Sequence, residues 1–151
     1  MNHHYANLDF TKFQNPKASP AHHKVLDTTA CFIPQAPSAV KQYLDLNHIL
    51  TLQSWAMVTH IIERELGNDS GHFLGENIHP NFLVPERTDE NAFEKITKEL
   101  ILLDVRFHNA FQGTKEIGGY HFEFAGNKQI RMNCNAPFSH SYDEGIIRKI
   151  C

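Results

Sequence analysis

Histidine is the residue type in which this sequence departs most from an ordinary composition, with 11 histidines among 151 residues. Neutral imidazole is a common metal ligand, and histidine can change its charge near neutral pH. The residue types best suited to form a metal site together are found at His48, Asp104 and His108. Two imidazoles and one carboxylate form the ligand set of mononuclear non-haem iron sites, and they also suit zinc with a water as fourth ligand. Asp104 and His108 are four positions apart, which places them on one face of a helix.

A metal-free interpretation uses the same side chains. Burying an unpaired histidine or carboxylate is costly, so His48 and Asp104 could instead neutralise each other through a hydrogen bond inside the core. Together with Trp55 and Phe107 they would line an apolar pocket with a few polar groups, which is the usual anatomy of a small-molecule site. The sequence leaves both alternatives open: a zinc or iron site at His48, Asp104 and His108, or a ligand pocket at His48, Trp55, Asp104 and Phe107.

Other chemistry-bearing residues match no catalytic motif. The sequence contains no nucleophile elbow, no P-loop and no dinucleotide-binding glycine pattern. His60 and Glu63 are three positions apart, but the helical projection places both on a face that we expect to be solvated. We therefore expect a non-catalytic regulatory or ligand-binding domain, with a metal-binding protein or metalloenzyme as the alternative.

Near the end of the chain, Cys134, His140 and Cys151 look like a further ligand set. Cys134 alternates in step with Ile130 and Met132, which predicts a thiol on the apolar face of a strand. His140 is expected in the turn that follows Pro137. We expect strand, turn and helix here rather than a site.

Composition limits the classes of partner and compartment. The formal net charge is −3 and no long Lys/Arg cluster occurs, which argues against nucleic acid as a partner. The sequence shows neither a signal peptide pattern nor an apolar run long enough to cross a membrane. Three cysteines are an odd number in a chain of this size, which favours reduced thiols. We expect a soluble, cytoplasmic protein.

The elements that must position these residues begin with a proline-rich extended arm over residues 1–37, followed by a single α+β domain over 38–151. Ser38 and Gly67 are suitable cap residues for one long helix between them. That helix has a main apolar stripe and, almost opposite, a second stripe formed by Tyr43, Leu50, Met57 and Ile61. A helix that is apolar on two sides is either covered by the rest of its chain or shared with a partner. We expect a homodimer through the second stripe, with coverage by the arm as the alternative.

Residues 68–87 read as a long loop with a short helix around 72–78, and a second helix follows over 88–113. Its apolar stripe comprises Phe93, Ile96, Leu100, Leu103, Phe107 and Phe111. We expect it to pack antiparallel on the first long helix, which would bring His48 next to Asp104 and His108.

After Gly118 the period of the apolar residues changes from helical to two, which predicts a β-hairpin over 120–134. Placing the apolar residues on one face pairs Phe124 with Ile130 and Glu123 with Arg131. A short helix over 143–151, capped by Ser141 or Asp143, is expected to end the chain.

Overall fold

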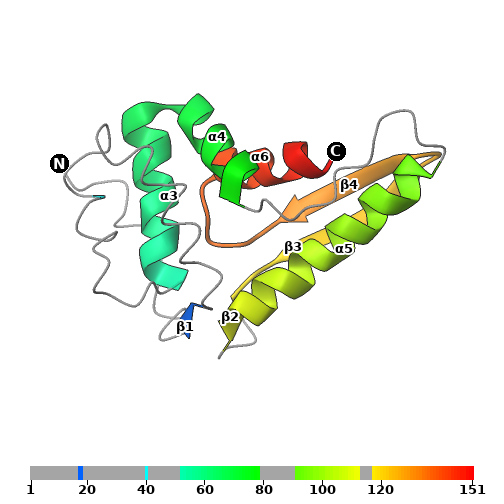
Figure 1. Cartoon of the computed structure of the whole chain (residues 1–151), viewed down its shortest axis with the longest axis horizontal. Helices are drawn as coiled ribbons and strands as arrows, with labels where there is room; N and C mark the ends of the chain where they lie inside the picture. Colours follow the sequence, from blue (N-terminus) through cyan, green and yellow to red (C-terminus); the bar gives the residue numbers. More distant parts are fainter. Residues whose placement is uncertain (1–16, 19–39, 41–51, 79–90, 113–116) are drawn as a thin grey trace.

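The computed structural model describes residues 17–18, 40, 52–78, 91–112 and 117–151, and it has the predicted α+β class (Figure 1). The helices of this part are α3 (Leu52–Leu66), α4 (Asn68–Ile78), α5 (Ala92–Ala110) and α6 (His140–Ile150). The strands are β1 (Lys17–Ala18), β2 (Phe111–Gln112), β3 (Tyr120–Gly126) and β4 (Gln129–Cys134). The predicted hairpin and the short terminal helix are confirmed. Within these described ranges, no helix is both long and apolar enough to cross a membrane.

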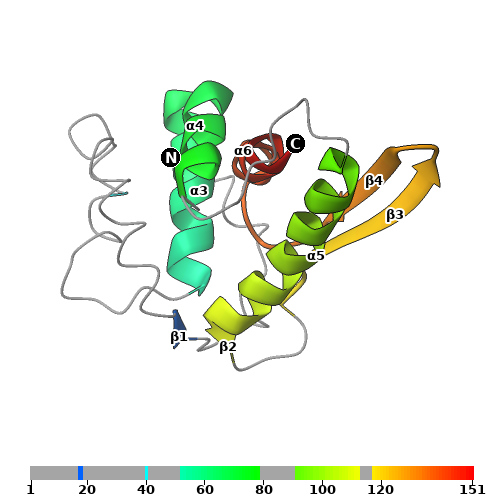
Figure 2. The ribbon, with the colours of Figure 1, turned by 45° about the vertical axis from the view of Figure 1, so that its right-hand side comes forward.

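Helix α5 covers one face of the hairpin formed by β3 and β4, and it runs in the opposite direction to β3 (Figures 1 and 2). At one end the ring of Phe93 lies 6.2 Å from that of Phe124, and at the other the ring of Phe107 lies 5.6 Å from that of Tyr120. The predicted apolar stripe of this helix is confirmed for Leu100, Leu103 and Phe107, which are buried, and for Phe93 and Ile96, which are half-buried. The side chain of Phe111 lies outside the described residues.

The hairpin has the predicted register. Glu123 pairs with Arg131, and Phe124 pairs with Ile130. A bulge follows Phe124, and Gly126 pairs with Gln129 across the turn. Lys128 in this turn has a φ of 54°, in the left-handed region that non-glycine residues seldom adopt. The alternation of apolar residues was sufficient to set the register because a shift of one residue would expose the whole apolar face.

The packing of the long helices differs from the prediction. Helix α3 lies against α4 and α6, whereas α5 lies against β3 and α6. The segment predicted mainly as a loop is helical from Asn68, because Gly67, with a φ of 86°, ends α3 and its carbonyl accepts a hydrogen bond from Ser70 N as α4 begins. The position beside α3 that we assigned to the second long helix is therefore occupied by α4. His48 lies outside the described residues.

Part of the N-terminal arm contacts its own chain. Strand β1 pairs antiparallel with β2, with Lys17 opposite Gln112 and Ala18 opposite Phe111. Strand β2 directly follows α5, so this contact ties a point in the arm to the end of that helix. The rest of the arm, apart from these two residues, lies outside the described part of the chain.

Helices α4 and α6 approach each other closely at three glycines. A side chain on Gly71 would overlap Ser141, one on Gly75 would overlap the Tyr142 carbonyl, and one on Gly145 would overlap the His72 carbonyl. This contact was not predicted, because glycines inside a helix ordinarily signal low helix propensity rather than close packing.

We predict that Gly145→Ala destabilises the fold, although alanine is intrinsically about 1 kcal/mol better in a helix interior. The added methyl group must push against the backbone of α4, and overpacking of this kind typically costs about 1–3 kcal/mol. Denaturant unfolding measures the difference. Gly126→Ala is the control, since only the flexible Gln129 side chain lies near that position; equal stability of the two variants would contradict the close approach.

Candidate functional site

The N-terminus of α6 is held by side chains of α3. Thr59 Oγ1 accepts a hydrogen bond from Ser139 N at 3.0 Å and donates one to the Ala56 carbonyl at 2.8 Å. One turn further along α3, Glu63 Oε2 accepts a hydrogen bond from Ser141 N at 2.7 Å. Ser139 is the N-cap residue but its own side chain makes no capping bond. Helix α3 therefore supplies the acceptors that the first N–H groups of α6 need.

These contacts correct two predictions. The expected solvated face of the first helix at His60 and Glu63 is wrong: His60 Nε2 lies 3.0 Å from the Pro137 carbonyl oxygen, and Glu63 binds the end of α6. The terminal helix begins at His140, three residues before the expected start, and its N-cap is Ser139 rather than Ser141 or Asp143. The helix begins earlier because its cap partners come from α3, and no local sequence pattern records them.

Asp143, in the first turn of α6, is a buried acid. Its side chain is almost fully enclosed, with 4% of the residue exposed, and its Oδ1 accepts a hydrogen bond from the Tyr120 hydroxyl at 2.6 Å. Burial raises the pKa of Asp143 to about 7; the Tyr120 hydrogen bond opposes this rise, and the negative charge of Glu63 adds to it. Asp143 can therefore hold a proton at a pH where most aspartates are ionised.

The groups around Asp143 respond to the same burial and charge. Burial raises the pKa of Tyr120 and of Tyr142, and the Asp143 carboxylate raises both further. The pKa of the half-buried Cys134 thiol is raised to about 11, by burial and then by Asp143. Glu63 behaves differently: burial alone would raise its pKa, but its contacts with Ser141, His60 and Ser139 together outweigh burial and lower it. The cluster thus contains one carboxyl group whose pKa is lowered and one whose pKa is raised to about 7.

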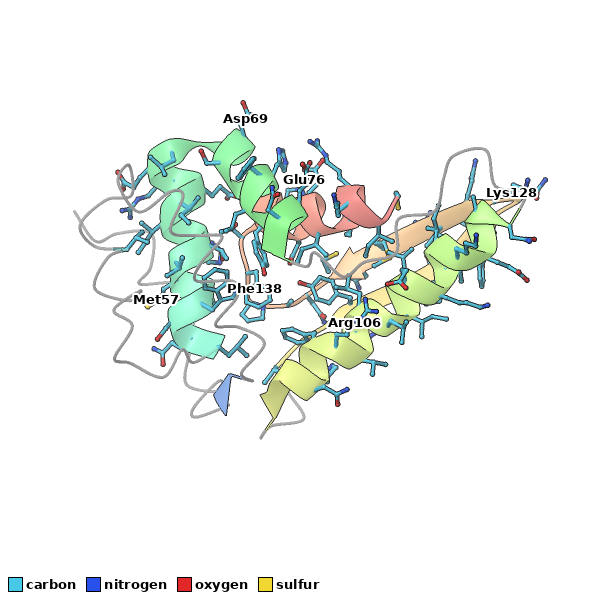
Figure 3. All side chains as sticks on the ribbon, in the orientation of Figure 1. Met57, Asp69, Glu76, Arg106, Lys128 and Phe138 are labelled. Carbon is cyan, nitrogen blue, oxygen red and sulfur yellow. The ribbon has the colours of Figure 1, made fainter. Side chains whose placement is uncertain are left out.

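An aromatic cluster that includes Tyr120 adjoins this acid and contains two residues predicted for the ligand site. Trp55 Nε1 donates to the Tyr142 hydroxyl at 3.2 Å, and the ring of Phe138 lies 5.0 Å from that of Tyr142. The ring centroid of Phe138 also lies 5.7 Å from that of Phe107, and the Phe107 ring packs on Tyr120. Figure 3 shows Phe138 in the space between α3 and α5. The structure therefore brings Trp55 and Phe107 into one contiguous cluster without direct packing of their two helices.

Asp104 and His108 also converge. Asp104 Oδ1 accepts a hydrogen bond from Tyr120 N at 2.8 Å, and His108 Nε2 lies 3.5 Å from the same oxygen. Gly119 makes room for them, because a side chain there would overlap Asp104 Oδ1. His48 lies outside the described residues, so the predicted three-residue metal site stays a prediction. Across the described ranges, no group of three or more His, Cys, Asp or Glu side chains is arranged to hold a metal ion.

Comparisons with protein-family models, curated proteins and solved structures yield no match to this chain. The candidate site therefore rests on its own geometry, and its central residues are Asp143, Tyr120 and Glu63. From the sequence we expected Asp143 only as a possible helix cap and Tyr120 only as a residue of the hairpin. One feature of the sequence could have suggested their role: Tyr120 lies at the start of the hairpin and Asp143 at the start of the terminal helix, where neighbouring elements must meet.

We predict that Thr59→Val destabilises the chain by about 1–3 kcal/mol, because valine has a similar shape but leaves the buried Ser139 N–H without an acceptor. Chemical denaturation measures the change. Thr97→Val is the control: that hydroxyl donates to the Phe93 carbonyl of its own helix, so its loss should cost about 0.5 kcal/mol or less. Similar losses in the two variants would contradict a docking role for Thr59.

Proposed function

We propose that this chain is a small non-catalytic regulatory or ligand-binding domain that acts as a homodimer. The observation that carries the proposal is an apolar strip on the outer face of α5. Ile101, Leu102 and Val105 are 46%, 38% and 47% exposed, although the opposite face of the same helix is buried against the hairpin and α6. A second observation supports a non-catalytic role, because Asp104 and Glu63 each accept a backbone hydrogen bond that holds one element to another.

The strip on α5 suits a second copy of the chain. Its residues follow one another at i, i+1 and i+4, so they form one continuous surface on the helix. A helix that is apolar on two sides is typical of an element shared with a partner. A two-fold axis across the strip would let it cover itself, and most soluble homo-oligomers are built in this way.

The proposed dimer uses a different helix from the one expected from the sequence. In the predicted stripe, Ile61 belongs to the core and is only 2% exposed, while Met57 is half-buried. Tyr43 and Leu50 lie outside the described residues. The argument that an exposed second apolar face attracts a partner applies better to α5, whose strip is exposed.

Sedimentation velocity tests the proposed dimer. We expect the wild-type chain to sediment as a dimer at micromolar concentration and Leu102→Glu to sediment as a folded monomer, because the substitution places a charge in the centre of the strip. Phe73→Glu is the matched control, since it makes the same kind of change at an exposed phenylalanine of α4. A monomeric wild type, or a dimer unaffected by Leu102→Glu, would end the proposal.

A metal-binding role is the second candidate, because the structure brings Asp104 and His108 together. We propose that these two side chains, with His48, hold zinc or iron. Elemental analysis of untagged protein should then find about one metal per chain, lost in His108→Ala. His121→Ala, at an exposed histidine on the hairpin, should leave the metal content unchanged. Metal-free wild type, or metal retained in His108→Ala, rejects this candidate.

A cytoplasmic location is part of the proposal. Cys134 and Cys151 are free thiols in the structure, and reduced thiols are characteristic of proteins in a reducing compartment. The net charge of −3 also supports a protein or small-molecule partner over nucleic acid.

A further inference from the structure

We propose that the buried Asp143 carboxyl group is a proton-operated switch, which holds α6 firmly against α3 and β3 when protonated and loosens that contact when ionised. This switch uses residues in the interior of the chain, so it does not depend on the proposed dimer through α5.

Asp143 lies in α6 and interacts with residues of two other elements, β3 and α3. It belongs to the first turn of α6, it accepts a hydrogen bond from Tyr120 of β3, and it acts electrostatically on Glu63 of α3. Glu63 itself caps the end of α6 through Ser141 N. A negative charge on Asp143 would therefore repel the Glu63 carboxylate, which attaches α6 to α3. Asp143 is almost fully enclosed, so water can screen this repulsion only from the side of the half-buried Glu63.

Among the residues that the structure describes, the titratable groups that face Asp143 are acids. They are Glu63 from α3, Tyr120 from β3, Cys134 from β4 and Tyr142 from α6 itself. None of these four can supply a positive charge, and a buried carboxylate ordinarily needs a cation or several hydrogen-bond donors to remain ionised. Tyr120 is the donor that the structure provides.

The other charged groups nearby are engaged elsewhere. On α3, His60 contacts the Pro137 carbonyl and acts on Glu63. On α4, His72 lies 3.0 Å from a carboxylate oxygen of Glu144, which also accepts a hydrogen bond from Arg148.

Two charged side chains of α5 likewise have other partners. Arg106 pairs with Glu99 at 2.8 Å, and Asp104 binds the backbone of Tyr120 rather than its hydroxyl. Neither the α4 network nor these α5 contacts provides a counter-charge that is bonded to Asp143.

The direction of the pH effect follows from the two pKa values. In the unfolded chain Asp143 has its ordinary pKa of 3.8, and in the folded chain burial raises it to about 7. Between these values the folded chain keeps a proton that the unfolded chain has lost, so this group's contribution to stability decreases as the pH rises from 3.8 to about 7. Above that range Asp143 is ionised in both states, and it causes no further change. The loosened form is thus the one populated above neutral pH.

Trp55 provides a built-in reporter for this change. It is the only tryptophan of the chain, and its indole nitrogen donates to the hydroxyl of Tyr142, the residue directly before Asp143. Its ring is fully buried and lies edge-on to Tyr142, with 6.0 Å between centroids. Movement of α6 away from α3 would change the environment of Trp55 and hence its fluorescence.

The test is a pH titration of Trp55 fluorescence in the full chain, with circular dichroism to confirm that the chain stays folded. We expect a reversible transition with a midpoint near pH 7 in the wild type and its loss in Asp143→Asn, which keeps the shape and the acceptor oxygen but cannot ionise. Asp69→Asn, at an exposed position of α4, is the control and should keep the wild-type midpoint.

Two further variants move the midpoint in opposite directions. Tyr120→Phe removes the hydrogen bond that favours the ionised form, so the midpoint should rise. Glu63→Gln removes the repelling charge but keeps an acceptor for Ser141 N, so the midpoint should fall. These shifts keep the proposal testable even if Asp143→Asn does not fold. A wild type without the transition, a transition retained in Asp143→Asn, or unmoved midpoints in both other variants would overturn it.

Discussion

The rest of this structure depends on how the first N–H groups of α6 obtain their hydrogen-bond acceptors. A helix N-terminus buried without such partners would be strongly unfavourable. Here the acceptors are the Thr59 hydroxyl and the Glu63 carboxylate of α3, one helical turn apart. Because the terminal helix is capped by another helix, its position is fixed in three dimensions. This also determines which face of α6 packs against α4, the hairpin and the aromatic cluster.

Tyr120 transmits this arrangement to the other half of the domain. Its backbone N–H binds Asp104 of α5, its ring packs on Phe107, and its hydroxyl donates to Asp143. One residue at the start of β3 therefore connects α5, the hairpin and α6. This explains how an isolated two-stranded hairpin, which is marginal in water, is held in a defined place. It also explains why Asp143, in the first turn of α6, is deeply buried.

The same interior suggests how such a small domain could be regulated. The polar groups predicted for chemistry act mainly as connections between elements, and connections made by ionisable groups respond to protons. The exposed strip on α5 lies opposite the face of that helix that packs on the hairpin and α6, so the proposed dimer contact and the proposed response to pH involve separate parts of the chain. A regulatory domain needs both a surface that binds and an interior that can change.

The features that depend on local periodicity could be predicted from the sequence. Alternation between Tyr120 and Cys134 was enough for the hairpin and its register, and helical spacing was enough for the buried stripe of α5, because each depends on which residues share one face of one element. Which elements meet depends on contacts between residues distant in sequence. Gly71, Gly75 and Gly145 allow α4 and α6 to approach closely, and Glu63, which was expected to be solvated, binds the end of α6. The burial of Asp143 belongs to the same class: a pKa depends on surroundings that only the folded chain assembles.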